Sequence, residues 1–560
     1  MLIVYIMQPE GDPSRPSIQK GDEVKKRTRA VALALSLSLV AVACGGSDDD
    51  DGADDAPADT EAGSGDDAAE TDDGGTSASD AADDAPVDGA AVVIALGSEP
   101  TSLDPHLVED GSERAINDNV YESLLTRTPD GEIIPGLASA LPTQVDETTW
   151  QFTLNEGVVF HNGEEFNADS VVASVERMLR LIGDGVTDLD GYYSIITGAE
   201  AVDATTVNIT TAEPDGVLPA RMTWLKMIPP SSAESDDLSD TVVGTGPYEF
   251  VEWVRGERVD LVASGNYWGD TPSVAEAKYT FVSESGSRFA GLLSGDYDLI
   301  TNLSPADVGQ APQVAAVQGQ EHPIIILDAD EGITADVNVR TALNLAVDKE
   351  AIAESLFGGF AAVDPGQLLS ESILGFNPDL EAYPYDPDQA QQLIQDAGVA
   401  GETITLVGES SGRWLLDAEL LQAVAGYWED AGLTVDLQLP EFGEYLDVLF
   451  DRDSRADAIF VSSSNDILDA DRQLSTYYQA GGIGSSNSDA DLAELIDQGR
   501  STLDEAERES IYQQAVAVAY DQAYFVWLIN NQDIYGLSER MEWTPRVDSK
   551  ILLKEMAVSG

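Results

Sequence analysis

One stretch decides the fold class of this 560-residue chain: Leu415-Leu-Asp-Ala-Glu-Leu-Leu-Gln-Ala-Val-Ala-Gly-Tyr-Trp-Glu-Asp-Ala-Gly-Leu-Thr-Val-Asp-Leu-Gln-Leu439. We predict a helix over Leu415–Asp430, an exit through Gly432, and a strand over Leu433–Leu439. A helix that leads directly into a strand is typical of proteins that pack helices against a sheet. The stretch therefore indicates an α/β or α+β protein.

The same mixture of helices and strands extends outward along the chain. Asp386-Pro387 begins a helix that ends at Gly398, because aspartate caps a helix, proline suits its first turn and glycine favours its exit. Further helices are predicted over Ala168–Leu181, capped by Asn167 or Asp169, and over Asp336–Phe357, ended by Gly358-Gly359, and strands over Val92–Leu96, Trp150–Leu154 and Tyr248–Val254.

The N-terminal 43 residues read as an extension followed by a secretory signal. Basic residues at Lys25–Arg29 precede the apolar run Ala30–Ala43, which is too short to span a bilayer of about 30 Å. Val40-Ala-Val-Ala-Cys44-Gly-Gly resembles a bacterial lipobox, whose cysteine becomes a lipidated N-terminus, although Ala41 stands where leucine is commonest. We expect Cys44 to carry a lipid anchor, and translation to start at Val24; the alternative to that start is a long, polar signal leader.

Acidic residues dominate the rest of the chain. Residues 44–91 contain many acidic residues and no basic or aromatic ones, so we expect a disordered tether. The full chain carries 103 acidic and 28 basic residues, a formal charge of −75. Such a charge repels nucleic acid and anionic lipid, so neither is an expected partner. It is also consistent with life in salt, where charge repulsion is screened.

Four groups of motifs follow one another along the chain. They are Thr101-Ser-Leu-Asp-Pro-His106 with Val120–Leu125 and Gly131–Ala138; Trp150–Gly157 with Val159-Phe-His-Asn-Gly163; Gly244-Thr-Gly-Pro-Tyr248 with Asn266-Tyr-Trp-Gly269; and Val339–Asp348 with Tyr385–Ala390 and Asp396-Ala-Gly398. Together they resemble the solute-binding proteins of peptide-type ABC transporters, family 5, which include oligopeptide-, dipeptide- and nickel-binding lipoproteins. Physically, Gly244 and Gly246 are expected to permit tight turns, and Arg340 to pair with a carboxylate.

The resemblance implies a two-lobed periplasmic-binding-protein fold (type II, cluster C) with an additional inserted domain. The implied boundaries are 92–121 for the first part of lobe I, 122–237 for the inserted domain, 238–333 for the second part of lobe I, 334–528 for lobe II and 529–560 for a return to lobe I. It further implies an extracytoplasmic, monomeric protein that closes on a solute and delivers it to an ABC permease, without catalysis, resident cofactor or metal.

The resemblance also implies where a ligand binds. Peptide-binding members hold extended peptide by main-chain pairing from both lobes, and an aspartate meets its amine. Here Glu109 to Gly111 would supply one edge and Ser462 to Ser464 the other, with Asp466 as the amine-binding carboxylate. The alternative for Asp466 is an ordinary loop or cap residue.

The chain departs from the family around Asp466, because the usual tryptophan and proline are missing from Val461–Ala470. Trp414 could replace the stacking platform and Arg413 could meet a ligand carboxylate, although both could equally be surface residues at a helix start. The ligand class stays open: oligopeptide leads, and oligosaccharide, chelated metal or another solute are alternatives.

Other classes of protein are weighed against a binding protein. Gly408-Glu-Ser-Ser-Gly412 matches the nucleophile elbow of hydrolases, but that motif requires a histidine later in the chain. All three histidines precede it, which argues against a hydrolase. An adhesion protein or receptor on the same fold, and a relic that no longer binds ligand, remain alternatives.

Overall fold

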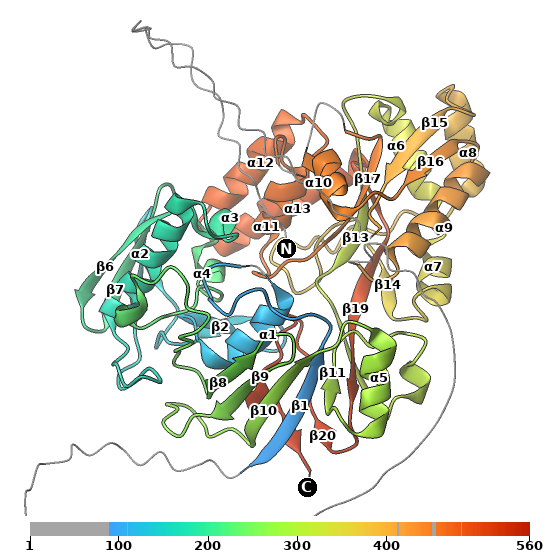
Figure 1. Cartoon of the computed structure of the whole chain (residues 1–560). Coiled ribbons are helices and arrows are strands. Elements are labelled where there is room, and N and C mark those ends of the chain that lie inside the picture. Colours follow the sequence, from blue (N-terminus) through green and yellow to red (C-terminus); the bar gives the residue numbers. More distant parts are fainter. Residues whose placement is uncertain (1–88, 109, 411–413, 451–454, 483, 560) are drawn as a thin grey trace, which may run out of the picture. The chain divides into compact units, whose positions relative to one another are not determined.

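The computed structural model describes residues 89–108, 110–410, 414–450, 455–482 and 484–559. All of these residues belong to one compact unit, in which helices and strands alternate as predicted (Figure 1). The predicted signal, Cys44, the tether, Glu109 and Arg413 lie outside the described residues.

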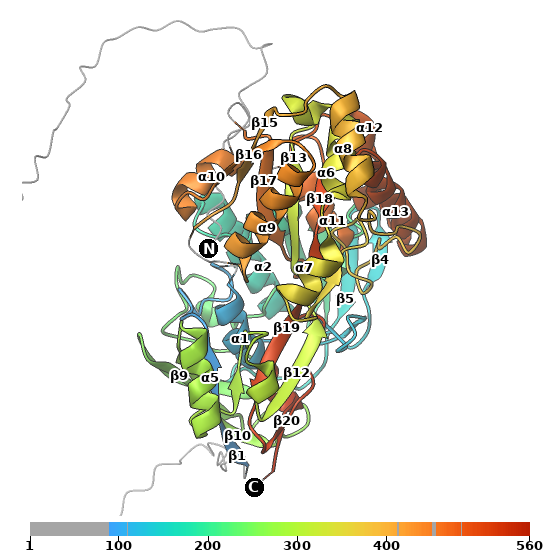
Figure 2. The ribbon, with the colours of Figure 1, turned by 90° about the vertical axis from the view of Figure 1, so that its right-hand side faces the viewer.

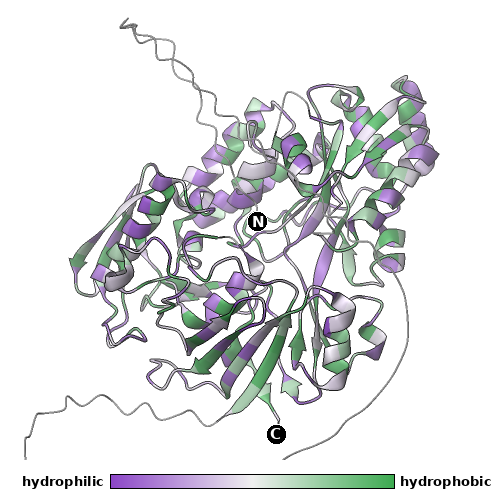
Figure 3. Ribbon diagram, in the orientation of Figure 1, coloured by the Kyte–Doolittle hydropathy of each residue, from purple (hydrophilic) through white to green (hydrophobic). Residues whose placement is uncertain are grey.

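An eight-stranded sheet forms what we call the first lobe. Its strands run in the order β12-β19-β11-β1-β10-β9-β8, and β14 pairs with β19. β1 is parallel to β10 and β11, whereas the other pairs are antiparallel. Figure 3 shows hydrophobic residues along β1, whose Ile94 and Ala95 are fully buried. The strands are β1 Ala90–Leu96, β8 Tyr248–Val254, β9 Arg258–Ala263, β10 Val274–Phe281, β11 Leu299–Ile300, β12 Gln313–Gln318, β14 Ala361–Val363 and β19 Ile529–Leu537.

Two helices and a short C-terminal hairpin complete the first lobe. The helices are α1 Gly111–Val120 and α5 Ser285–Ser294, and the hairpin pairs β20 Met541–Glu542 with β21 Ala557–Val558. α1 contacts β8, and α5 contacts β11 and β19.

A four-stranded sheet with its own helix, which we call the small domain, is inserted after α1. Its order is β4-β5-β7-β6, and α2 packs on β6 and β7. α2 begins with a capping box between Asn167 and Ser170 and ends at left-handed Gly185, close to the predicted helix. The elements of this region, in chain order, are the hairpin β2 Leu125–Arg127 and β3 Ile133–Pro135, then β4 Thr143–Asp146, β5 Thr149–Thr153, α2 Ala168–Asp184, α3 Asp190–Tyr193, β6 Ile196–Asp203, β7 Thr206–Thr211 and α4 Leu218–Arg221.

A five-stranded sheet of order β16-β15-β17-β13-β18 forms the second lobe. Its strands are β13 His322–Leu327, β15 Thr403–Val407, β16 Thr434–Gln438, β17 Ala458–Ser463 and β18 Phe525–Trp527. Its helices are α6 Val337–Leu345, α7 Lys349–Ser355, α8 Pro387–Asp396, α9 Asp417–Asp430, α10 Phe442–Phe450, α11 Ala470–Gln473, α12 Ala490–Ser501 and α13 Glu505–Asp521.

One local prediction of secondary structure differs from the structure. The expected helix Asp336–Phe357 is two helices, because Asp348 caps α7 by accepting a hydrogen bond from the Ala351 N–H. The five-stranded sheet also contains β13, which pairs with β17 and β18. The predicted domain boundaries stay predictions.

Arg340 and the Gly244-Thr-Gly246 motif have structural roles other than those expected. Arg340 donates hydrogen bonds to the carbonyl oxygens of Thr334, Ala335 and Gln522, whereas a carboxylate partner was expected. Neither glycine has a positive φ. A Cβ at Gly244 would lie 2.0 Å from the Val120 carbonyl oxygen, so close approach to the end of α1 requires glycine there.

Two chain segments cross between the lobes, and they are hydrogen-bonded to each other. One joins β12 to β13 and the other joins β18 to β19; β12 and β19 run side by side (Figure 2). The Gly319 N–H donates to the Asn531 carbonyl, and the Asn531 N–H donates to the Glu321 carbonyl. The paired crossings define the place about which the lobes can rotate.

Within the described part of the chain, no helix combines the length and the apolar character needed to cross a bilayer.

Candidate ligand-binding site

The strand predicted to pair with ligand is β17 of the second lobe. On one side its residues pair with β13 as far as Ser463, which lies opposite His322. On the other side β15 pairs only with Ala458 and Ile459, so the last four residues of β17 extend past that neighbour. A strand edge that continues beyond its neighbour is the kind of edge to which an extended peptide adds.

The two predicted serines differ in their surroundings. Ser462 is buried, and its Oγ has no hydrogen-bond partner among the described residues. Ser464 is exposed, and its carbonyl oxygen accepts a hydrogen bond of 2.8 Å from Gln473 Nε2. A buried hydroxyl without a hydrogen-bond partner destabilises the folded protein, and a bound polar group that pairs with it would remove this cost.

Asp466 follows β17 in a turn and contacts the first lobe. Its Oδ1 forms an ion pair with Nη1 of Arg114 on α1. The side chains are 9 % and 23 % exposed for Asp466 and Arg114, respectively, so water screens the pair only in part. The carboxylate predicted to meet a ligand amine therefore already holds a cation in this structure.

Arg114 also contacts the small domain and interacts electrostatically with the crossing strand. Its guanidinium lies 5.7 Å from the ring centroid of Trp224. Burial raises the pKa of Asp533 on β19, while the hydrogen bond from Ser549 and the charge of Arg114 oppose this rise. Arg114 is therefore the point at which both lobes, the small domain and the crossing strand interact.

Further arginines fix the segment that follows Asp466. Arg221 of the small domain pairs with Asp471 at 3.3 Å, and Arg500 of α12 pairs with it at 2.8 Å. Burial acts to raise the pKa of Asp471, but these two guanidinium groups outweigh it and the pKa is lowered. Arg127 donates to the Ile467 carbonyl. The position of Asp466 is thus set by contacts from the small domain and the second lobe.

Gly111 is the exposed first residue of α1, and the preceding Asp110 caps that helix by accepting from the Ser112 N–H. A Cβ at Gly111 would lie 3.9 Å from Nη2 of Arg114. The structure thus places Gly111 beside the Arg114–Asp466 pair, at the edge of the predicted site.

Trp414 packs into the second lobe instead of standing open as a platform. Its ring meets Phe460 of β17 edge to face at 5.5 Å and Tyr445 at 6.0 Å. Close by, burial raises the pKa of Asp417 to about 6, and a hydrogen bond with Glu409 adds to the rise. Trp414 therefore supports β17 two residues before Ser462.

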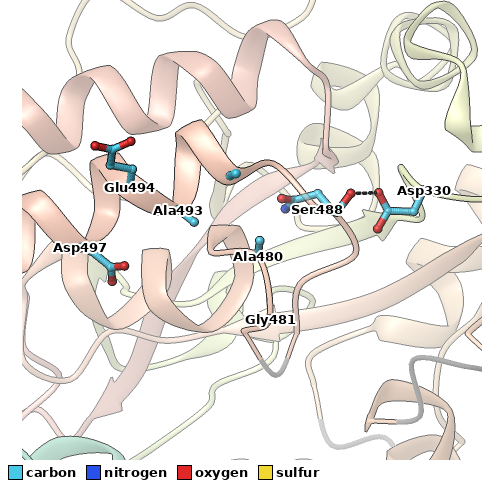
Figure 4. Close-up of a pocket in the computed structure, with 9 residues that line it drawn as sticks. Asp330, Ala480, Gly481, Ser488, Ala493, Glu494 and Asp497 are labelled. Atoms are coloured by element: carbon cyan, nitrogen blue, oxygen red, sulfur yellow. Dashed lines mark hydrogen bonds between the residues drawn. The ribbon is translucent and has the colours of Figure 1, made fainter. Parts of the chain in front are cut away.

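The pockets found on the second lobe lie elsewhere. The larger, of about 760 Å³, is bordered by Asp330, Glu494 and Asp497 (Figure 4). Ser488 Oγ donates to Asp330 at 2.7 Å across its rim. None of the predicted ligand residues lines this pocket or its neighbour, so the two hollows are separate from the site around Asp466.

A chain of hydrogen bonds at the crossing has the composition of a hydrolase triad. His322 Nδ1 lies 2.8 Å from Asp364, and its Nε2 lies 3.1 Å from Ser370 Oγ. However, Nε2 also accepts from Asn530 Nδ2 at 3.1 Å, and all four side chains are buried. The histidine thereby ties the second lobe to the crossing strand. Among the described residues, no three metal-binding side chains are grouped to hold an ion.

The sequence analysis missed Arg114 and Asp533. Arg114 is separated from Asp466 by 352 positions, and only the fold brings them together. The sequence contained only a weak signal for Arg114. Basic residues are scarce in this chain, so each arginine is a candidate for pairing with a carboxylate. That signal could identify Arg114 as a candidate for pairing, but could not select Asp466 among more than one hundred acidic residues.

Two known proteins are similar to this chain in sequence over most of its length. The heme-binding protein A of Haemophilus influenzae is 27 % identical over 80 % of this chain and 89 % of its own length. The dipeptide-binding protein of Escherichia coli is 25 % identical over 78 % and 88 %, respectively.

Solved structures share the fold. The ABC transporter-associated periplasmic binding protein DppA of Helicobacter pylori, in complex with the peptide STSA, gives a TM-score of 0.70 at 22 % identity, over 84 % of this chain and 98 % of that one. NikA of Brucella suis, in complex with Fe(III)-EDTA, gives 0.76 at 22 %, over 84 % and 100 %. The two-lobed α/β fold is confirmed.

The family model described as bacterial extracellular solute-binding proteins, family 5 Middle, matches residues 132–485, well over half of the chain. This chain therefore belongs to family 5 of the bacterial extracellular solute-binding proteins.

Proposed function

We propose that this protein captures an oligopeptide between its two lobes and delivers it to an ABC importer, acting as a monomer without catalysis of its own. One observation carries the proposal: Asp466 follows β17, whose last four residues extend past β15, and it contacts the first lobe, where it holds a cation. A peptide would add its main chain along β17 and place its terminal ammonium at Asp466. A charge-assisted contact of this kind contributes about 1.5–3 kcal/mol.

The test is binding of a defined peptide mixture to the purified full chain, by calorimetry and by native mass spectrometry of retained ligand. Asp466→Asn should weaken peptide binding by roughly tenfold to a hundredfold, which is the equilibrium effect of such a contact. Asp388→Asn is the matched control, because Asp388 is an exposed acidic residue on α8, away from the site. Equal affinities for the wild type and Asp466→Asn would remove Asp466 from the site.

A second ligand class is a solute without an amine, such as an oligosaccharide or a chelated metal. The lack of tryptophan and proline around Asp466 favours it, because a peptide platform is missing there. Retained sugar or metal chelate in native mass spectra, with Asp466→Asn binding as wild type, would support this class.

We further propose that the protein is held at the outer face of the cell membrane by a lipid on Cys44, which lies outside the described residues. Cys44→Ala should release the protein from the membrane fraction, with loss of the acyl mass. Membrane retention by Cys44→Ala would refute the anchor.

A further inference from the structure

We infer that Arg114 is an internal competitor for the cationic group of the ligand, and that ligand binds by exchanging its ammonium for Arg114 at Asp466. The inference rests on the proposed function and deepens it, because it specifies a solute with a free ammonium group. It starts from one contact: the guanidinium of Arg114 on the first lobe pairs with the Asp466 carboxylate on the second.

The surroundings of Arg114 favour this exchange. Two carboxylates, Asp466 by direct contact and Asp533 through its charge, interact with this one guanidinium. The charge of Arg114 also acts on Glu113 and Asp118 of the same helix, so carboxylates surround this guanidinium. The ring of Trp224, 5.7 Å from the guanidinium, retains a favourable contact for Arg114 when it leaves Asp466.

The same contact also acts when no ligand is present. Arg114 and Asp466 come from opposite lobes, so their ion pair favours the closed arrangement in the way that a ligand would. Arg114 therefore raises the closed fraction of the empty protein and lowers the affinity of Asp466 for an incoming ammonium.

These two effects can be separated by a ratio of affinities. Changing Arg114 alters closure, which affects every ligand, but only ligands with an ammonium compete for Asp466. The ratio of the affinity for a free peptide to that for its N-acetylated form cancels the effect on closure. In Arg114→Gln this ratio should rise by about tenfold, which is the effect of one charge-assisted hydrogen bond.

The experiment uses the full chain and a tripeptide of defined sequence, free and N-acetylated, measured by calorimetry. Arg255→Gln is the matched control, because Arg255 also lies over a tryptophan, Trp253, but is exposed on a hairpin of the first lobe. Arg114→Lys retains the charge, so its ratio should stay within threefold of wild type. If Arg114→Gln does not fold, Arg114→Met is measured in its place, and its ratio should rise by about tenfold for the same reason.

Closure is read separately, without ligand, from spin-label distances between cysteines introduced at Leu293 and Gln391, which are exposed on α5 and α8. Arg114→Gln should broaden and lengthen the distances, whereas Arg255→Gln should not. An unchanged distance distribution would overturn the role of the ion pair in closure.

The outcomes distinguish this inference from the proposed function. If the wild type prefers the free peptide, Asp466→Asn loses that preference and Arg114→Gln leaves the ratio unchanged, the competitor role is wrong while the amine site stands. If the wild type and Arg114→Gln both bind the two peptides equally, the exchange and the amine-binding function are both wrong.

Discussion

A buried pair of charges between the first motif group and α2 offers the sharpest test of how the first lobe and the small domain are held together. Asp104 of the Leu-Asp-Pro-His stretch forms a two-point ion pair with Arg177 of α2, and neither side chain is exposed to solvent. Asp104 also accepts hydrogen bonds from the N–H groups of His106 and Leu238. We predict that Asp104→Asn strongly destabilises the protein.

The magnitude follows from what the substitution leaves behind. Asparagine has a single side-chain oxygen and can accept from only one of the two N–H groups, because these bond to different oxygens of Asp104. The guanidinium of Arg177 also stays buried without its counter-ion. Removing one member of a buried ion pair costs about 3–5 kcal/mol, because the remaining charge is not compensated. Arg177 keeps its Nε–H bond of 3.0 Å to the Ser235 carbonyl.

The same helix provides a matched control. Arg180 pairs with Asp184 at 3.8 Å on the surface of α2, and the aspartate side chain is 61 % exposed. Asp184→Asn should cost less than about 1 kcal/mol, because water screens exposed pairs.

The assay is urea-induced unfolding at pH 7, followed by circular dichroism and by tryptophan fluorescence in parallel, since a protein of several domains can unfold in more than one step. The step that reports the small domain should lose about 3–5 kcal/mol in Asp104→Asn. A loss below about 1 kcal/mol, equal to that of Asp184→Asn, would refute the reasoning that the pair is desolvated.

Two further predictions concern the same region. Gly244→Ala should lower the melting temperature by several degrees in a thermal scan, because its Cβ would lie 2.0 Å from the Val120 carbonyl oxygen. Gly198→Ala is the control for loss of a glycine alone, because Gly198 has no positive φ and nothing lies within 4 Å of its Cβ position. Burial, followed by the charge of Arg177, lowers the pKa of His106 to about 4 in the folded protein. In the unfolded chain the histidine has its ordinary pKa of about 6.5 and is protonated at a higher pH. The free energy of unfolding therefore decreases by roughly 3 kcal/mol as the pH falls from about 6.5 to about 4. His106→Gln should reduce that slope in unfolding experiments across this pH range, and an unchanged slope would show that His106 is not its source.

Local sequence was sufficient for elements whose ends are encoded by neighbouring residues. The cap at Asn167, the Asp386-Pro387 start and the strand Tyr248–Val254 were predicted within a few residues of the structure. It failed at Asp348, where an aspartate inside an apolar helical pattern starts a second helix. A side chain that can cap is also compatible with a helix interior, so the pattern did not decide between them.

The family motifs extended what the sequence determined, because they identified the two-lobed fold and family 5, both of which the comparisons support. They could not provide the site in full. Ser462, Ser464 and Asp466 were named by resemblance, and their role stays a prediction.

The tertiary structure alone decided what surrounds these residues. It brought Arg114 to Asp466 across 352 positions, and placed β13 between β17 and β18. Capping and periodicity act between residues a few positions apart, so one sequence contains their signal. Ion pairing and strand order depend on distances set by the whole fold, and in a chain with more than one hundred carboxylates no local pattern selects the partner of a single arginine.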